Sequence, residues 1–317
     1  MSTTNELPAA IAGSWRGFLE SFEPLRGELF RYCRYLTKSP WDAEDLSQDV
    51  LARAFVTLGK MGEPPPNPRA WLFRVASNLW IDRVRKVAGS YEAPVAIADR
   101  DPQAAREAAG TLLVQLAPQE RAAVVLKDVF AFSLEEIADV LATTVGAVKA
   151  ALHRGRGKLA EPEPITARTP APGVLDAFCT AFNAGDLDAL TQLLLDDAAI
   201  EVVGATVRYG REAARTPVLF GMLFGYDRMG DFGVIDVPPR VELREHRGEW
   251  VLLHWYTHAD GEAVRAVTRI EHDAHGITLV RNYFYSPDLV TNLCDELGLP
   301  HRGQGRLWWG ICKPAPS

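Results

Sequence analysis

Apolar residues in the first part of the chain recur every three or four positions, which is the spacing of amphipathic helices. Residues 15–37 carry one such stripe, made of Phe18, Phe22, Leu25, Leu29, Tyr32 and Leu36. Pro24 predicts a kink near the start of this stripe. A second helix is expected to begin at Ser39-Pro40, because acidic residues fill its first turn and apolar residues follow at helical spacing.

The helical pattern resumes after a proline-rich loop. Residues 59–67 contain three consecutive prolines, which cannot continue a helix. Asn67 followed by Pro68 predicts the start of a helix that runs to about residue 86. Residues 87–110 show weak periodicity and are interpreted as a linker. Three further helices are expected at 118–130, 133–142 and 144–159.

The second half of the chain changes character after a stiff connector. Residues 161–173 contain four prolines and mark a domain boundary. Residues 174–195 look helical, and a last helix is expected around Leu289 and Leu293. Between them lie alternating or β-branched runs, which predict strands at 200–203, 232–237, 241–243, 250–258, 264–271 and 277–285. These elements predict an α+β domain with a curved antiparallel sheet.

Residues 133–158 have the features of a helix-turn-helix. Ser133 and Glu136 form a capping box, and a short turn at residues 142–143 separates two amphipathic helices. From Thr144 to Lys158 the chain carries four positive side chains and one histidine, but no acid. Because a DNA backbone demands such a surface, this segment predicts DNA binding more strongly than it predicts an ordinary solvated helix.

Charge and composition narrow the class of protein. The net charge of −7 is unevenly distributed, since residues 1–160 have 20 Lys and Arg against 19 Asp and Glu, whereas residues 161–317 have 14 against 22. The four cysteines are far apart, which argues against a zinc ribbon and against a disulfide framework. No apolar run is long enough to span a bilayer, and the first residues lack a secretory signal. A cytoplasmic protein is expected.

Three separated segments resemble the extracytoplasmic-function (ECF) sigma factors of the sigma-70 family. They read DAEDLSQDVLARAF (42–55), NPRAWLFRVASNLWIDRVRK (67–86) and LAPQERAAVVLKDVFAFSLEEIADVLATTVGAVKAALHRGRGKL (116–159), in the order found in that family. The resemblance implies an alternative sigma factor that binds core RNA polymerase and directs promoter-specific transcription initiation. The implied partners are promoter DNA and, on the polymerase, the clamp helices of the largest subunit and the flap.

The resemblance also assigns residues to surfaces. The expected polymerase contacts are Asp42, Glu44, Asp45, Leu46, Gln48 and Asp49, although an acidic face can also be merely solvated. The expected contacts to the −10 element are Arg69, Arg74, Asn78 and Arg85. The expected contacts to the −35 element are Thr144, Ala147, Lys149 and Ala150, nearest the base edges, with His153, Arg154 and Arg156 nearer phosphates. The aromatic side chains of Trp71, Phe73 and Trp80 suit the core better than stacking on bases.

Residues 182–204 resemble the opening of a SnoaL-like domain, which has a cone-shaped fold. The alternating His254, Tyr256 and His258 share one strand face and, with Tyr283 and Tyr285, are candidates to line a cavity. Ordinary packing of polar residues is favoured over a ligand pocket, and catalysis is least favoured. No metal site, cofactor or enzymatic activity is expected. The adjacent Trp308 and Trp309 are expected to dock onto another part of the chain.

The predicted fold is therefore multidomain, with two all-α sigma domains, the second a helix-turn-helix, before an α+β cone-shaped domain. The predicted boundaries are 15–87 for sigma region 2, 88–112 for a linker, 113–160 for sigma region 4, 161–173 for the proline-rich linker and 174–312 for the SnoaL-like domain. The last domain is expected to regulate the others in cis. The alternatives are a helix-turn-helix regulator with a ligand-binding domain and a DNA-binding module fused to a cone-fold enzyme.

Overall fold

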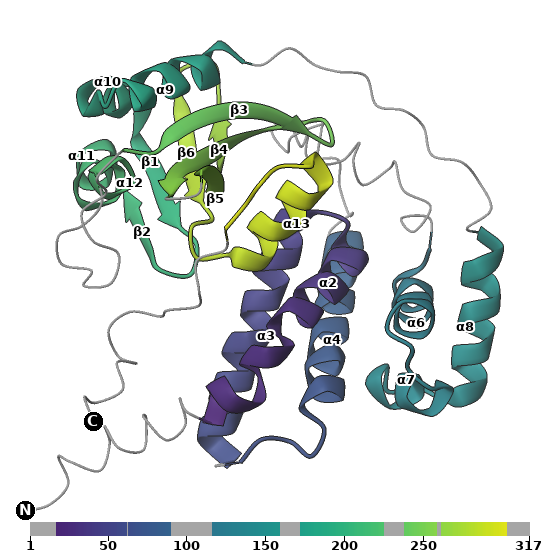
Figure 1. Cartoon of the computed structure of the whole chain (residues 1–317). Helices are drawn as coiled ribbons and strands as arrows, with labels where there is room; N and C mark the ends of the chain where they lie inside the picture. The colour runs from purple at the N-terminus through teal and green to yellow at the C-terminus, as the bar shows by residue number, and fades with distance from the viewer. Residues whose placement is uncertain are drawn as a thin grey trace, which may run out of the picture. The chain divides into compact units, whose positions relative to one another are not determined.

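The computed structural model describes residues 17–61, 63–89, 116–158, 172–224, 238–258 and 261–302 (Figure 1). The chain divides into two compact units, Met1–Thr166 and Ala167–Ser317. Of the helices in these described ranges, none combines the length and the apolar character needed to cross a bilayer. The expected strand at 232–237 and the two tryptophans at 308–309 lie outside the described residues.

The first unit begins with an N-terminal helical module, residues 17–89. It contains the short 3-10 helix η1 (Glu23–Leu25) and the helices α2 (Arg26–Thr37), α3 (Pro40–Met61) and α4 (Pro68–Gly89). Ser39 Oγ accepts a hydrogen bond from Asp42 N at 3.2 Å, and Asn67 Oδ1 accepts one from Ala70 N at 3.0 Å. Both predicted helix starts are confirmed, because these caps satisfy amides that the first turn leaves without a helical partner.

Aromatic and aliphatic side chains fill the interior of this module. Tyr32 is fully buried, stacks on Phe73 with ring centroids 4.4 Å apart, and shares a 2.7 Å hydrogen bond with Ser77 Oγ. Burial raises the pKa of the Tyr32 hydroxyl well above its ordinary value. Phe73 and Trp80 are also buried. The interpretation of these two rings as core residues is confirmed.

The same unit contains a middle helical module, residues 116–158, made of α6 (Pro118–Asp128), α7 (Leu134–Val140) and α8 (Val145–Lys158). Ser133 and Glu136 exchange the two hydrogen bonds of a capping box, at 2.8 and 3.1 Å. The turn between α7 and α8 passes through Ala142, which has a φ of 49°. The predicted helix-turn-helix is confirmed.

The second unit is an α+β domain with one six-stranded sheet. Its elements are α9 (Gly173–Asn183), α10 (Leu187–Gln192), β1 (Leu194–Val202), β2 (Thr206–Tyr209), α11 (Arg211–Ala214), the π-helical turn η3 (Arg215–Leu219), α12 (Phe220–Phe224), β3 (Arg240–His246), β4 (Glu249–His258), β5 (Gly261–His272), β6 (Ile277–Asn282) and α13 (Pro287–Leu297). The strand order is β2-β1-β6-β5-β4-β3.

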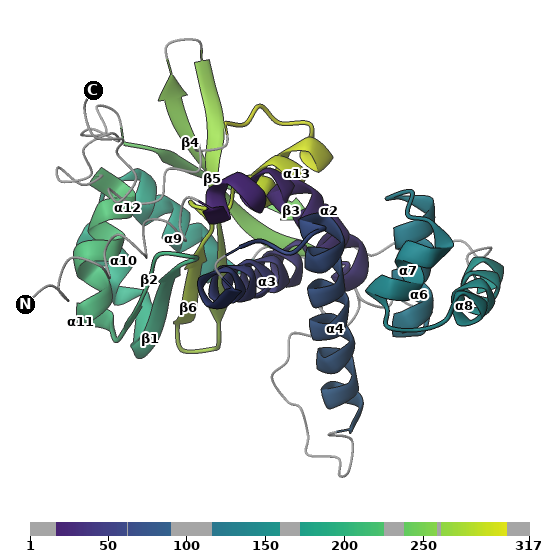
Figure 2. The same cartoon turned by 90° about the horizontal axis from the view of Figure 1, so that it is seen from below.

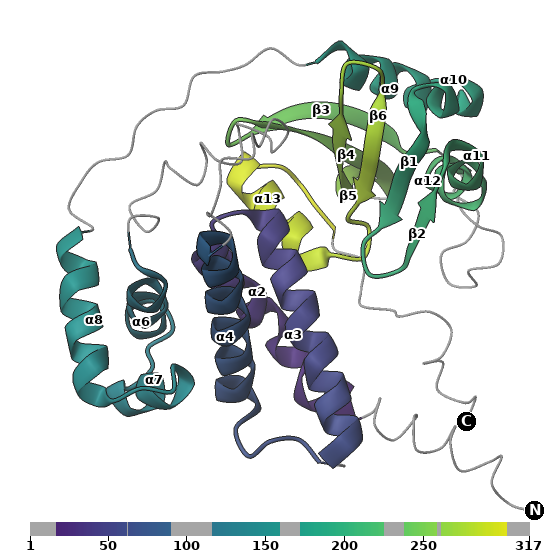
Figure 3. The ribbon, with the colours of Figure 1, turned by 180° about the vertical axis from the view of Figure 1, so that it is seen from behind.

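The sequence predicts an antiparallel sheet. The structure departs from this at one place, because β1 and β6 pair in parallel. Every other neighbouring pair is antiparallel. Consecutive strands joined by a short turn must run in opposite directions, but β1 and β6 are separated by four other strands along the chain, so no hairpin sets their direction. Figure 3 shows α9 to α12 on one side of this sheet and α13 on the other.

The helices of the second unit cover an apolar sheet face. Phe178 and Phe182 of α9 pack with Leu252, Ile270 and Val280 of the central strands in one buried cluster. The segment 174–195, expected to be helical, forms the two helices α9 and α10, which are separated at Gly185, whose φ is 67°, and β1 begins at Leu194. Asp186 then caps α10 by accepting a hydrogen bond from Ala189 N at 2.9 Å.

Candidate nucleic-acid interface

The exposed face of α8 carries the residues predicted to meet the −35 element. All seven of those side chains are exposed: Thr144, Ala147, Lys149, Ala150, His153, Arg154 and Arg156. Thr144 has an additional role, because its Oγ1 accepts a hydrogen bond from Ala147 N at 3.2 Å and so caps the helix. The small side chains at 147 and 150 leave the helix backbone open to close approach by a partner.

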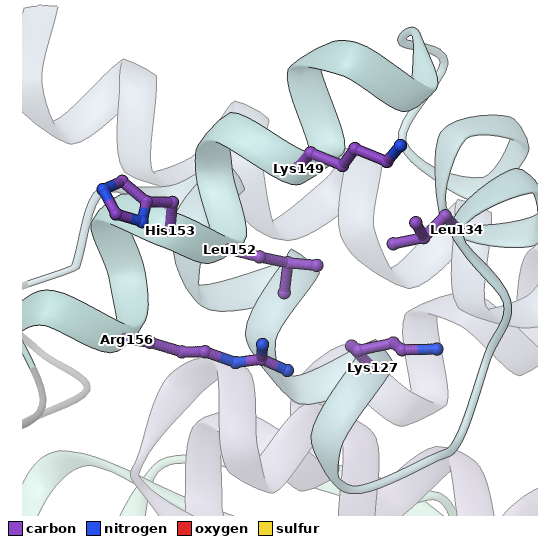
Figure 4. Close-up of a pocket in the computed structure, with 6 residues that line it drawn as sticks. All are labelled: Lys127, Leu134, Lys149, Leu152, His153 and Arg156. Carbon is purple, nitrogen blue, oxygen red and sulfur yellow. The ribbon is translucent and has the colours of Figure 1, made fainter.

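A basic pocket opens beside α8, with a volume of about 510 Å³ (Figure 4). It is lined by the apolar Leu134 and Leu152 and by four basic side chains: Lys127, Lys149, His153 and Arg156. Lys127 comes from α6 and donates a hydrogen bond to Phe132 O at 3.1 Å. Sequence reasoning missed Lys127, because a single lysine in an apolar helix gives no local signal. A pocket of this charge suits an anion such as a backbone phosphate.

Two arginines of α8 are held by carboxylates of α6. Arg154 Nε donates to Glu120 Oε1 at 2.8 Å, and the Glu120 side chain is only 7% exposed. Arg156 donates to both carboxylate oxygens of Asp128, and these hydrogen bonds raise the pKa of Arg156 above its ordinary value. The two arginines therefore fasten α8 to α6 and do not present uncompensated charge to a partner.

The second candidate surface follows α4. Arg74, Asn78 and Arg85 are exposed, and Arg74 and Asn78 lie one turn apart on the same helix face. Arg69 differs from them, since its guanidinium forms a forked pair with the Glu28 carboxylate at 2.5–3.0 Å. The predicted −10 contact at Arg69 is thus already engaged within the chain, whereas the other three side chains face outward.

The acidic face of α3 is smaller than the sequence predicted. Asp42 and Asp49 are exposed, and Asp45 and Gln48 are half-buried. Glu44 is 1% exposed and Leu46 is fully buried, so the prediction that these two contact a partner directly is corrected. Glu44 instead accepts hydrogen bonds from Arg26 at 3.4 Å and Gln48 at 2.9 Å. Its helical position faces α2, where a buried carboxylate requires a cation.

A chain of hydrogen bonds runs through the sheet of the second unit. Phe284 N donates to Asn282 Oδ1 at 3.1 Å, and Asn282 Nδ2 donates to Thr268 Oγ1 at 2.9 Å. The Thr268 hydroxyl also shares a 2.7 Å hydrogen bond with His254 Nε2. Burial lowers the pKa of His254 to about 3, so the ring is neutral.

The five cavity candidates do not form a single catalytic cluster. His254 contacts Thr268 and lies edge-on to Phe182, with ring centroids 5.2 Å apart; sequence reasoning missed both partners because they lie on other elements. Tyr256 is buried near Phe284, Tyr283 is fully buried, and His258 and Tyr285 are half-buried. Across the residues with described side chains, no group of three or more His, Cys, Asp or Glu could hold a metal ion.

Comparison with known proteins identifies both helical modules. Residues 22–89 match the family model of Sigma-70 region 2, and residues 106–159 match that of Sigma-70, region 4. The ECF RNA polymerase sigma factor SigJ of Mycobacterium tuberculosis is 32% identical over 199 residues, covering 56% of this chain and 62% of SigJ. The ECF RNA polymerase sigma factor SigM of the same species is 30% identical over 164 residues, covering 50% of this chain and 83% of SigM.

Solved structures give weaker similarities. The crystal structure of SigJ from M. tuberculosis is 24% identical, covers 86% of this chain and 98% of that chain, and has a TM-score of 0.32. An NTF-2 like protein of unknown function from Burkholderia xenovorans is 17% identical, covers 46% of this chain and 94% of that chain, and has a TM-score of 0.26.

The match spans about three fifths of the length of SigJ, and the same holds for SigG of M. tuberculosis. The region 2 match contains η1 and α2 to α4, and the region 4 match contains α6 to α8. With two sigma regions in order and a relative matched over most of its length, the chain belongs to the family of ECF RNA polymerase sigma factors.

Proposed function

We propose that this chain is an alternative sigma factor that binds core RNA polymerase and directs promoter-specific transcription initiation. The observation that carries the proposal is the pairing of region 2 and region 4 folds with three exposed polar faces, one each on α3, α4 and α8. The faces on α4 and α8 are basic, which suits DNA. The face on α3 is acidic, which suits a basic protein partner.

The acidic face of α3 is assigned to the clamp helices of the polymerase. Asp42 and Asp49 are exposed at its two ends, and Asp45 and Gln48 lie between them. Charged residues at the rim of a protein interface increase the specificity and the association rate of the complex, because their electric field orients the partner before contact. The flap of the polymerase is assigned to the region 4 module.

The two basic faces are assigned to the two promoter elements. Arg74, Asn78 and Arg85 of α4 are assigned to the −10 element, and Arg69 joins them only when it leaves Glu28. The α8 face and the basic pocket beside it are assigned to the −35 element, with Lys127 as an additional phosphate contact. The small side chains of Ala147 and Ala150 favour readout of DNA shape over base hydrogen bonds.

The α+β domain is assigned a regulatory role in cis rather than an enzymatic one. Residues 161–317 carry 14 basic and 22 acidic side chains, which suits contact with basic helices. In the described part of this domain the buried His254 is neutral and bonded to Thr268, and no metal-binding group accompanies it. The site of action is the cytoplasm, where RNA polymerase works, and no cofactor or small ligand is assigned.

Runoff transcription with core RNA polymerase tests the proposal. Full-length protein should yield a promoter-specific transcript, and the double variant Asp45→Lys/Asp49→Lys should fail to form holoenzyme while keeping its thermal transition nearly unchanged. The matched control is Asp197→Lys/Glu212→Lys, which makes the same change in net charge on exposed residues of the second unit.

The control variant should transcribe like the wild type. Normal holoenzyme formation by the α3 variant would reject the assignment of that face. Promoter binding without any dependence on core polymerase would reject the sigma factor function and favour a helix-turn-helix regulator.

A further inference from the structure

The hairpin formed by β4 and β5 contains a bulge that sets one arginine apart. The register of the two strands shifts by one residue between His254 and Trp255, which leaves Arg265 as the extra residue of β5. A bulge takes its extra residue out of the ladder and redirects its side chain, and bulges are common beside binding sites. Figure 2 shows this hairpin extending past the neighbouring strands, with the chain after α13 returning to it.

The Arg265 side chain is half-buried and lies over an aromatic ring. Its guanidinium carbon is 5.3 Å from the centroid of the Tyr256 ring, and Tyr256 is 8% exposed. This contact occupies one face of the guanidinium plane but uses none of its N–H donors. Arg265 Nε is buried, and within the described ranges no hydrogen-bond acceptor reaches it. Because a buried donor without an acceptor is costly, the side chain is suited to an acceptor from outside the chain.

Most other arginines of the same unit are neutralised by carboxylates. Among the described residues, seven of them form ion pairs: Arg211, Arg215, Arg240, Arg244, Arg247, Arg269 and Arg281. Arg265 has no such pair in the described part of the domain, and its nearest acid along β5, Glu262, accepts from Arg240 at 2.9 Å. A partly desolvated cation lowers stability when no anion compensates it, so this position favours binding over folding.

Backbone pairing fixes a second cation next to Arg265. The chain after α13 adds to the edge of β5 at Val264, which donates to Pro300 O at 3.0 Å and accepts from Arg302 N at 2.9 Å. The Arg302 side chain is exposed. Burial lowers the pKa of Arg265 below its ordinary value, and the charge of Arg302 contributes in the same direction. Neighbouring cations repel each other, and an anion bound by both removes that cost.

Aromatic surface lies next to the ring that carries Arg265. The Phe284 centroid is 6.3 Å from that of Tyr256, and the Tyr285 ring lies edge-on to Phe284 at 5.0 Å between centroids. Phe284 and Tyr285 are half-buried, so part of each ring is accessible. A site with cations at one end and aromatic rings at the other suits a ligand that joins an anionic group to an apolar one.

We propose that Arg265 and Arg302 bind the carboxylate of a small organic acid, whose apolar part lies against Phe284 and Tyr285. The planar fork of a guanidinium matches a carboxylate through two parallel hydrogen bonds. A carboxylate carries a single charge and requires fewer donors than phosphate, which suits a half-buried site beside aromatic rings. The inference goes beyond the proposed regulatory role of the domain, since it adds a class of ligand.

Ligand-observed NMR titrations of the full-length protein test this site. Benzoate joins a carboxylate to an aromatic ring, acetate carries the carboxylate alone, and benzyl alcohol carries the ring without the charge. Benzoate should bind saturably at millimolar concentration or below, and acetate should bind about tenfold more weakly, because it lacks the apolar surface. Benzyl alcohol and inorganic phosphate should show no saturable binding.

Replacement of Arg265 by methionine removes the guanidinium and keeps a long apolar side chain. Arg265→Met should weaken benzoate binding about tenfold or more, as expected for the loss of a charge-assisted hydrogen bond. It should not lower the melting temperature, because within the described ranges no carboxylate depends on this cation. Arg208→Met makes the same change at an exposed position of β2 and should leave benzoate binding unchanged. Lys149→Ala, in the basic pocket beside α8, should leave it unchanged as well.

The outcomes are decisive in both directions. Benzoate binding that is lost in Arg265→Met and retained in both controls supports the site. Equal affinity for the wild type and Arg265→Met, or no saturable binding of benzoate, overturns it, and phosphate binding as tight as that of benzoate overturns the assignment to a carboxylate. A melting temperature that falls in Arg265→Met but not in Arg208→Met identifies Arg265 as a structural residue and rejects the site. These measurements need no polymerase, so their result is independent of the sigma factor function.

Discussion

Two cations on α8 are expected to respond differently to replacement by alanine. Lys149 lines the basic pocket, and among the described residues no ion pair engages it. Arg154 donates to Glu120 at 2.8 Å and thereby neutralises a carboxylate that is almost completely buried. Lys149→Ala should therefore act on DNA binding, whereas Arg154→Ala should act mainly on the stability of region 4.

The sizes of these effects follow from the exposure of each group. Loss of one phosphate contact lowers the magnitude of the slope of log K against log salt by ~0.9, and Lys149→Ala should show this smaller slope. Lys149→Ala should also change the preference among −35 variants. Its free energy of unfolding should stay within about 0.5 kcal/mol of that of the wild type. Arg154→Ala removes one hydrogen-bonded cation from a buried carboxylate, which costs roughly 1–3 kcal/mol. Because Arg154 is 58% exposed and water weakens the pair, the lower end applies, or ~2–4 °C in the melting temperature.

Fluorescence anisotropy on a −35 duplex across a salt series, together with thermal unfolding, measures both effects. Glu120→Gln in the Arg154→Ala background should recover part of the lost stability, since it removes the buried negative charge while an amide oxygen can still accept from Ala117 N. If Arg154→Ala melts like the wild type and lowers the salt slope as much as Lys149→Ala does, the division into fastening and DNA-binding cations is wrong.

Three further predictions concern the sheet, the helix contact and the connector. Because the pKa of His254 is lowered by folding, its contribution to the free energy of unfolding is fully present above pH ~6.5 and falls as the pH drops toward 3. Urea unfolding should show that the free energy of unfolding decreases by about 2 kcal/mol between pH 7 and 5. This decrease should be absent in His254→Gln. Gly155→Ala places a β-carbon 2.7 Å from Val124 Cγ2 and should cost ~1–3 kcal/mol in thermal unfolding. Gly146→Ala should be neutral or stabilising, because its β-carbon would lie in ordinary contact with Thr144 Oγ1 at 3.8 Å. Deletion of the chain from Pro164 onward should change promoter output in runoff transcription, and identical output from both proteins would reject regulation in cis.

Local signals in the sequence were sufficient to predict where the helices of the two helical modules begin. Ser39, Asn67 and Ser133 each cap a helix as predicted, because a cap depends on residues within one turn. Burial of an acid depends on a distant partner, so the sequence pattern placed Glu44 on the surface although Arg26 of another helix holds it in the interior. The acids Glu28, Glu120 and Asp128 were missed as arginine partners for the same reason.

The second unit was harder to predict because its important contacts are long-range. The strand β2 and the short helices α11 and α12 were missed, since each spans only four or five residues and carries little periodicity. His254 was correctly placed on a strand, but its partner Thr268 lies on β5, and Asn282, which donates to Thr268, lies on β6. The parallel pairing of β1 and β6 follows from strand order, which no local pattern specifies.

Internal ion pairs reduce the charge that the free chain can offer to DNA. Seven cations were assigned to the two promoter elements, and three of them are bound to carboxylates of the same unit, namely Arg69, Arg154 and Arg156. The remaining four have no ion pair within the described ranges, namely Arg74, Arg85, Lys127 and Lys149. At ~0.9 per phosphate contact, the free chain should show a salt slope of about −4 rather than −6. The free protein is therefore expected to bind promoter DNA weakly.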